Sequence, residues 1–266
     1  MGELWNNETK LFLDEKVDQY NGTDFIESDP ISIPHQFTKK EDVEIAGLLA
    51  ATIAWGQRKT IINNANKMME FMDNSPHDFV MNHISSDLVP LRKFKHRTFN
   101  GDDFCYFITQ LQRIYRFHGG IESCFKKEIT SNSKDMAMAI ESFRTIFFDQ
   151  VTDDNKRTMK HVSSPLKGSA AKRLIMYLRW MVRKDSKGVD FGIWNTIKPA
   201  DLICPLDVHV DRIARRYNLL ERKQSDWKSA LELTNNLRKF DPTDPVKYDF
   251  ALFGIGIDEK ANPLGR

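Results

Sequence analysis

Apolar residues recur at three- and four-residue spacing through most of the chain, which is the period of an α-helix with one buried face. In residues 170–183, for example, Leu174, Leu178 and Met181 fall on one side. No segment alternates apolar and polar residues with the period of two that indicates a strand. We therefore expect an all-α fold. The same spacing predicts further helices over residues 4–20, 37–52, 102–117, 121–129, 137–148 and 227–237.

Residues 163–217 contain two helices that each begin with an ionisable residue. The helix over residues 170–183 opens near Lys172, and Arg179 and Arg183 fall with this lysine on the side opposite the apolar face. We expect these three side chains to form an exposed basic stripe. The second helix follows Pro205, and Asp207 stands where an N-cap residue is expected, accepting hydrogen bonds from backbone N–H groups.

A lysine and an aspartate at neighbouring helix starts are the two groups that amine nucleophilic chemistry needs. An amine attacks only when it is neutral, and a nearby carboxylate can take its proton and stabilise a developing cation. The spacing also agrees with a simpler interpretation, in which the arginines are a solvated face and Asp207 is only a cap. Both interpretations stay open on spacing alone.

The chain has 266 residues, of which 41% are hydrophobic and 29% charged, and this composition is ordinary for a globular protein. We expect one all-α unit over residues 1–266, built of two packed helical halves, with residues 163–217 as the active stretch. Cys105, Cys124 and Cys204 are widely spaced and match no metal-ligand pattern, so we expect no metal and no cofactor. Widely spaced, odd-numbered cysteines fit a reducing compartment.

No apolar run approaches the ~20 residues of a membrane helix. The first 18 residues include Glu3, Glu8, Asp14 and Glu15, a pattern of an amphipathic helix and not of a signal peptide. We therefore expect a cytoplasmic protein that does not bind membranes, and a monomer.

Two motifs in the active stretch resemble a known superfamily. KRLIMYLRWMVR, a loop, and then PLDVHVDRIARR are similar to the lysine and aspartate segments of the helix-hairpin-helix DNA glycosylases, and the separation of Lys172 from Asp207 most resembles the archaeal 8-oxoguanine glycosylase group. GLLAATIAWGQRKTI, over residues 47–61, is similar to the early helix of the superfamily that ends in a Gln-containing turn near the base pocket. The whole chain also resembles a bacterial family of conserved proteins of unknown function, DUF2400, which lies near these glycosylases.

The resemblance implies a DNA repair glycosylase and AP lyase with two helical halves flanking a cleft, acting on a damaged base such as an oxidised purine. The nucleotide would be flipped out of the duplex, because its sugar carbon cannot be reached inside the stack. Lys172 would attack C1′ and form a Schiff base, and Asp207 would activate Lys172 and stabilise the oxocarbenium-like charge.

The resemblance also implies the DNA-binding residues. Trp55 would lie in the base pocket and stack on a base, with a simple core role as the alternative. Gln57 would hydrogen-bond the flipped base or the strand gap that it leaves, with a turn residue that bonds nearby backbone as the alternative, and Arg58 at the same turn would contact DNA. The remaining implied contacts, with the phosphate backbone, are Lys167, Gly168, Arg179, Arg183 and Arg212.

The sequence departs from the superfamily in two places. Its common LPGVG hairpin, whose backbone amides bind a phosphate, is replaced by PLKGSA over residues 165–170, in which Gly168 is the only glycine. The four-cysteine iron–sulfur loop of some relatives is missing, and no cysteine follows Asp207.

Two other function classes stay open beside the glycosylase. One is a non-catalytic nucleic-acid-binding protein that keeps the glycosylase-like scaffold. The other is a helical protein-interaction domain whose basic segment meets an acidic partner. Salt-dependent DNA binding distinguishes the first two from the third, and borohydride trapping distinguishes the enzyme from the scaffold.

Overall fold

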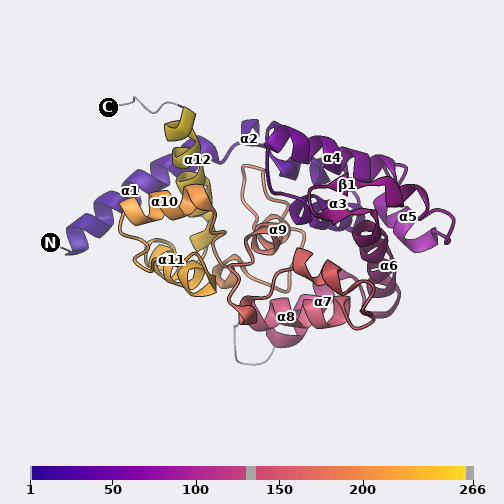
Figure 1. Ribbon diagram of the computed structural model, residues 1–266. Helices are drawn as coiled ribbons and strands as arrows, with labels where there is room; N and C mark the ends of the chain where they lie inside the picture. Colours follow the sequence, from indigo (N-terminus) through magenta and orange to yellow (C-terminus); the bar gives the residue numbers. More distant parts are fainter. Residues whose placement is uncertain (1, 130–135, 262–266) are drawn as a thin grey trace. The chain divides into compact units, whose positions relative to one another are not determined.

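The computed structural model describes residues 2–129 and 136–261, and helices dominate this part of the chain (Figure 1). The expected all-α fold is confirmed. The chain forms two compact units. Unit 1 combines Met1–Phe25 with Lys167–Arg266, and unit 2 is Ile26–Leu166. The predicted active stretch, residues 163–217, therefore belongs to unit 1 except for its first four residues.

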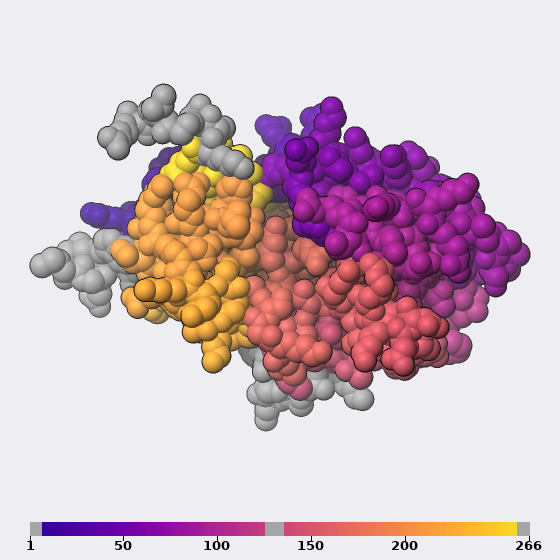
Figure 2. Space-filling model, in the orientation of Figure 1, coloured from indigo at the N-terminus to yellow at the C-terminus, as the bar shows by residue number. Residues whose placement is uncertain are grey.

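Unit 1 is organised around its last helix, α12 (Tyr248–Ala261). Helices α1 (Gly2–Tyr20) and α10 (Val208–Arg216) both pack against α12 (Figures 1 and 2). The other elements of unit 1 are α9 (Lys172–Val182), α11 (Trp227–Phe240) and the 3₁₀ turns η6 (Pro199–Asp201) and η7 (Pro245–Lys247).

The contact between α1 and α12 depends on a glycine. The ring of Tyr20 lies over Gly254, where a Cβ atom would be only 2.3 Å from the ring. The hydroxyl of Tyr20 donates a hydrogen bond of 2.6 Å to Asp258, one turn further along α12. One aromatic residue thus fixes the end of α1 by close packing and by a charge-assisted hydrogen bond.

Unit 2 is built around α3 (Lys40–Thr52), which is buried from Val43 to Thr52 and packs against α4 and α5. Its one buried carboxylate, Glu44, accepts a hydrogen bond of 2.7 Å from Tyr115. The remaining elements of unit 2 are η1 (Pro30–Ser32), η2 (Pro34–Gln36), α4 (Arg58–Glu70), α5 (Pro76–Asn82), η3 (Pro90–Lys93), β1 (Lys95–His96), β2 (Phe99–Asn100), α6 (Gly101–Phe117), α7 (Ile121–Ile129), α8 (Met136–Phe147) and η4 (Lys156–His161). Two short elements, α2 (Asp24–Glu27) and η5 (Pro165–Lys167), span the unit boundaries in the sequence.

The strands β1 and β2 pair antiparallel and are a difference from the sequence-based expectation. Each strand has two residues, which is too short to show a period of two. The hairpin leads directly into α6, whose N-cap Asn100 forms a capping box with Asp103.

The predicted helices are otherwise confirmed, with boundaries that shift by a few residues. Within the described residues, no helix combines the length and the apolar character needed to cross a membrane. Cys105, Cys124 and Cys204 are buried free thiols.

We predict that Gly254→Ala destabilises the protein although alanine is the better helix former. The added Cβ overlaps the Tyr20 ring, and such overpacking costs about 1–3 kcal/mol. Gly22→Ala is the matched control, because nothing lies within 4 Å of its Cβ position. Chemical denaturation should show a lowered free energy of unfolding for Gly254→Ala alone, and equal stability of the two variants would contradict this packing.

Candidate functional site

Lys172 is the first residue of α9, as expected, and its backbone surroundings are strained. Ala171, the N-cap residue, has φ 48° and lies in the left-handed region, which costs a non-glycine residue about 1–3 kcal/mol. The N-terminal end of a helix carries partial positive charge, so it is also the unfavourable end for a lysine. Neither feature improves the stability of α9, and both are typical of functional positions.

Asp207 is the N-cap residue of α10, and its two carboxylate oxygens have different partners. Oδ1 accepts hydrogen bonds from the backbone N–H groups of His209 and Val210, at 2.8 and 2.9 Å. Oδ2 lies 3.5 Å from Nζ of Lys172. The Lys172 side chain is 32% exposed and that of Asp207 14%, so the pair is accessible to solvent. The expected proximity of the two residues is confirmed.

The segment before Asp207 is rigidly held. Residues 202–206 are all buried, and the backbone N–H of Cys204 donates a hydrogen bond of 2.9 Å to Thr234 of α11. Burial raises the pKa of the Cys204 thiol well above its usual value, so this cysteine remains a neutral, unreactive packing group. Asp207 therefore follows a buried, hydrogen-bonded segment that fixes its position next to Lys172.

Arg179 and Arg183 anchor α9 and do not form the exposed stripe expected from the sequence. Only 3% of Arg179 and 2% of Arg183 is exposed. Both guanidinium groups pair with Asp190, at 3.2 and 3.1 Å, and both lie over the ring of Phe250 in α12. The exposed-stripe expectation is wrong, and these arginines are not available to DNA phosphates.

Further carboxylates complete this buried charge cluster. Arg179 also pairs with Asp249 of α12, and Arg183 pairs with Asp244 at 2.8 Å and with Asp185 at 2.7 Å. Two guanidinium groups thus face four carboxylates, counting Asp190, Asp185, Asp244 and Asp249. Asp190 and Asp249 are buried, whereas Asp185 and Asp244 are partly exposed, and burial raises the pKa of Asp244 and of Asp249.

Asp249 shows the effect of burial most clearly. Burial raises the pKa of Asp249 to about 6, opposed by the charge of Arg179 and reinforced by that of Asp207. The charge of Lys172 also acts on Asp249 and lowers its pKa. A buried carboxyl group that changes protonation near neutral pH therefore lies within electrostatic reach of the Lys172–Asp207 pair.

Sequence reasoning missed both Asp249 and Asp190. No local signal marks either residue, because their arginine partners are 7 to 70 positions away in the chain. The sequence contained one indirect signal. Two arginines on a helix with a large apolar face require buried counter-charges if they are not exposed to solvent.

The other predicted residues of unit 1 lie around the pair in the sequence but outside the charge cluster. Arg212, on α10, pairs with Glu259 at 2.9 Å and donates to the carbonyl of Gly256. Lys167 and Gly168 are exposed in the turn before α9, where Gly168 has φ 86°. Their role as phosphate contacts stays a prediction.

The predicted base-pocket residue Trp55 and the predicted DNA-binding residues Gln57 and Arg58 belong to unit 2. Trp55 is half-buried and stacks on His161 with ring centres 6.0 Å apart. Gln57 is the exposed N-cap residue of α4 and makes no capping hydrogen bond with its side chain, and Arg58 begins that helix. These three residues are adjacent at the turn between α3 and α4, as the sequence predicts, and their contact with a base stays a prediction.

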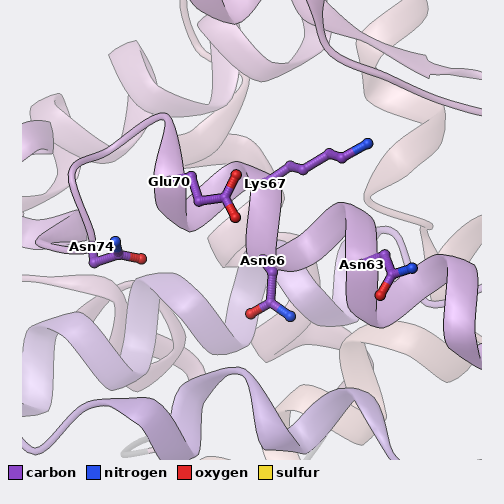
Figure 3. Close-up of a pocket in the computed structure, with 5 residues that line it drawn as sticks. All are labelled: Asn63, Asn66, Lys67, Glu70 and Asn74. Atoms are coloured by element: carbon purple, nitrogen blue, oxygen red, sulfur yellow. The ribbon is translucent and has the colours of Figure 1, made fainter.

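A polar groove of about 440 Å³ lies along α4 in unit 2 (Figure 3). Its lining combines three asparagines with one lysine and one glutamate, so it has no charge preference for phosphate: Asn63, Asn66, Lys67, Glu70 and Asn74. None of the predicted site residues lines this groove. Among the described residues, no group of three or more His, Cys, Asp or Glu side chains has the arrangement of a metal site.

The sequence matches one protein family over most of its length. The model of a family described as "Protein of unknown function (DUF2400)" matches residues 29–258. The chain belongs to this family. The DUF2400 region includes Lys172, Asp207 and the whole buried charge cluster. Comparison with curated proteins and with solved structures gave no match.

We predict that Arg179→Met strongly destabilises this DUF2400 protein. The substitution leaves Asp190 and Asp249 buried with less compensating charge, and breaking a buried pair costs about 3–5 kcal/mol. Arg216→Met is the matched control, because Arg216 forms a half-exposed pair with Glu259 that contributes less than ~1 kcal/mol. Denaturant titration should separate the two variants, and equal stability would show that Arg179 is not a structural anchor.

The raised pKa of Asp249 predicts a specific pH dependence of stability. The folded protein binds a proton at Asp249 more tightly than the unfolded chain does, so this residue's contribution to the free energy of unfolding falls as pH rises from about 4 to about 6. Asp249→Asn, which mimics the protonated form, should therefore gain stability relative to wild type over this range.

Asp226→Asn provides a control without this pH dependence. The pKa of Asp226 is lowered, first by its hydrogen bond from Arg222, so its carboxylate is ionised in both the folded and the unfolded chain above about pH 5, and the difference in stability between wild type and this variant should be nearly constant there. Urea titrations from pH 4 to 7 measure both differences. A pH-independent difference between wild type and Asp249→Asn would contradict the raised pKa.

Proposed function

We propose that this protein is a DNA glycosylase and AP lyase of the helix-hairpin-helix type, in which Lys172 forms a Schiff base with C1′ of a damaged nucleotide. One observation carries the proposal: Nζ of Lys172 and Oδ2 of Asp207 lie 3.5 Å apart at the starts of two helices, where both side chains reach solvent. The resemblance of the two motifs to the glycosylase segments supports the assignment, as does the all-α fold.

The geometry supplies a base for the amine. A distance of 3.5 Å exceeds that of a direct hydrogen bond, and such contacts tighten when a substrate binds. Oδ1 of Asp207 is engaged by the cap, so Oδ2 is the oxygen that faces Nζ of Lys172. The carboxylate can accept a proton from the ammonium group while α10 holds its orientation.

The reaction can then be written with every bond accounted for. The neutral Nζ of Lys172 bonds to C1′ while the bond from C1′ to the base breaks, and the base leaves with the electron pair and takes up a proton. The cationic Nζ then gives one of its two protons to the ring oxygen O4′ while the bond from C1′ to O4′ breaks, which opens the sugar and leaves a protonated imine. Removal of a proton from C2′ then expels the 3′ phosphate and nicks the strand. Asp207 would give the proton that it accepted from Lys172 to the departing base, and its regained negative charge would then stabilise the cationic sugar.

The lesion proposed is an oxidised purine, because the separation of Lys172 from Asp207 resembles the archaeal 8-oxoguanine glycosylases. Arg212, Lys167 and Gly168 are the proposed phosphate contacts of unit 1. Gly168 is well suited to a close backbone approach, because nothing lies within 4 Å of the position of its missing Cβ.

We predict that borohydride traps a covalent adduct between this protein and abasic DNA, because hydride reduces the imine to a stable secondary amine. Lys172→Gln should abolish the adduct and leave the fold intact, since a half-exposed helix-opening lysine contributes little to packing. Lys184→Gln is the matched control: it removes an exposed lysine just beyond the other end of α9 and should trap as wild type does.

Asp207→Asn should behave differently from Lys172→Gln. Asparagine keeps the cap but removes the charge, so DNA binding should survive while turnover falls by about 10²- to 10⁴-fold, as expected for a lost general base. Gel electrophoresis of the trapped complex and of the nicked strand measures both effects. Wild-type protein that binds abasic DNA without forming an adduct would contradict the enzyme and favour a non-catalytic DNA-binding scaffold.

A further inference from the structure

Unit 2 carries a basic surface that lies outside the Lys172–Asp207 site. Its members are exposed lysines and arginines of η3, of the β1–β2 hairpin and of η4, and we call them the hairpin surface: Arg92, Lys93, Lys95, Arg97, Lys156, Arg157 and Lys160. Lys93 at the end of η3 and Lys156 at the start of η4 are 63 positions apart, so local charge alone does not explain the cluster.

Arg157 joins η4 to the hairpin. Its guanidinium donates to Oδ1 of Asn100 at 3.1 Å, to Oδ2 of Asp103 at 2.8 Å and to the carbonyl of Thr98 at 2.9 Å. Thr158, the next residue of η4, donates to Oδ1 of Asp103 at 2.7 Å. These hydrogen bonds hold η4 next to the hairpin, so the two basic segments lie side by side.

Asp103 makes this junction rigid. It is fully buried, and although burial opposes ionisation, hydrogen bonds from His161, from the backbone of Asn100 and from Thr158 hold its pKa well below the usual value. An ionised carboxylate with this many donors is a strong, directional anchor. The surface is thus organised before any ligand binds.

The surface has an excess of positive charge. Arg92 pairs with Asp102 and Arg157 with Asp103, whereas the other five cations have no ion pair with any residue in the described part of the chain. Even with Asp153 and Asp154, which are exposed just before η4, four carboxylates stand against seven cations. The chain as a whole has a net charge of only +2, so this charge is concentrated locally.

An aromatic residue borders the cations. The ring of Trp55 stacks on His161 of η4 and meets His96 of β1 edge-on, with ring centres 5.2 Å apart. Arg97, at the hairpin turn, has its Nη1 3.1 Å from the Cβ position of Gly56. The half-buried indole is therefore held beside the hairpin by its two histidine neighbours.

We propose that the hairpin surface binds the phosphodiester backbone of a nucleic acid, with Trp55 positioned to stack against a base. Five cations without an ion-pair partner fit a polyanion whose charges repeat at regular spacing. An anionic lipid or an acidic protein would use the same cations, but a tryptophan held at their border favours nucleic acid, because aromatic stacking on bases is a sequence-tolerant contribution to affinity. The inference rests on the proposed function only for the class of ligand.

The test is the salt dependence of DNA binding by the full chain, measured by fluorescence anisotropy with a labelled 20-nucleotide DNA as single strand and as duplex. A triple variant, Lys93→Ala, Lys95→Ala and Lys160→Ala, removes three exposed cations that no described contact uses in folding. The slope of log K against log salt concentration should decrease by about two, since each lost phosphate contact contributes ~0.7 to 0.9.

The matched control removes three exposed lysines of unit 1, by Lys198→Ala, Lys223→Ala and Lys228→Ala. It changes the net charge equally and should keep the wild-type slope. Equal slopes for wild type and the hairpin variant would overturn the proposal, as would an equal loss in the control. Binding of wild type to vesicles of anionic phosphatidylserine but not to DNA would also overturn it, in favour of a membrane surface.

The same variants separate this inference from the enzyme proposal. If the hairpin variant loses salt-dependent binding while wild type gives no borohydride adduct, the surface stands and the Schiff-base chemistry fails. If wild type gives the adduct and the hairpin variant binds with an unchanged slope, the chemistry stands and the surface fails.

Discussion

The contact between Arg179 and Asp249 is the interaction on which the candidate site depends. It ties α9, which begins with Lys172, to α12. The same helix α12 holds α10, which begins at Asp207, because the ring nitrogen Nδ1 of His209 lies 3.1 Å from the carbonyl of Gly256 and a side chain at Gly256 would collide with His209. Lys172 and Asp207 therefore share one platform, and their separation is set by two independent attachments to α12.

The buried ion pairs of this platform carry a desolvation cost, and this cost bears on function. Buried ion pairs are weak evidence for stability, because desolvation opposes their attraction, and an apolar core of the same volume would often be as stable. Here burial raises the pKa of Asp249 although the charge of Arg179 opposes the rise. Together with the left-handed Ala171, the cluster concentrates unfavourable energy beside Lys172 and Asp207. Proteins keep such local costs mainly where function requires them.

The sequence predicted what local patterns determine. Asp207 as a cap and Lys172 as a helix-opening residue follow from neighbouring residues, and both are confirmed. Arg179 and Arg183 were predicted wrongly because helical periodicity assigns a charged face to solvent, whereas their partners Asp190, Asp244 and Asp249 lie outside α9, 7 to 70 positions away in the chain. The hairpin at residues 95–100 was missed because two-residue strands have no detectable period. Local sequence patterns therefore could not predict ion pairs with residues outside a helix or strands of two residues.

The central claim is that Lys172, held against Asp207 by this framework, is the reactive amine. Its most direct measurement is peptide mapping by mass spectrometry of the protein after borohydride reduction in the presence of abasic DNA and digestion of the complex. The account predicts that the DNA-derived mass is attached to the peptide that contains Lys172 and to no other lysine. Attachment to a different lysine, such as Lys167 five residues earlier, would contradict the account.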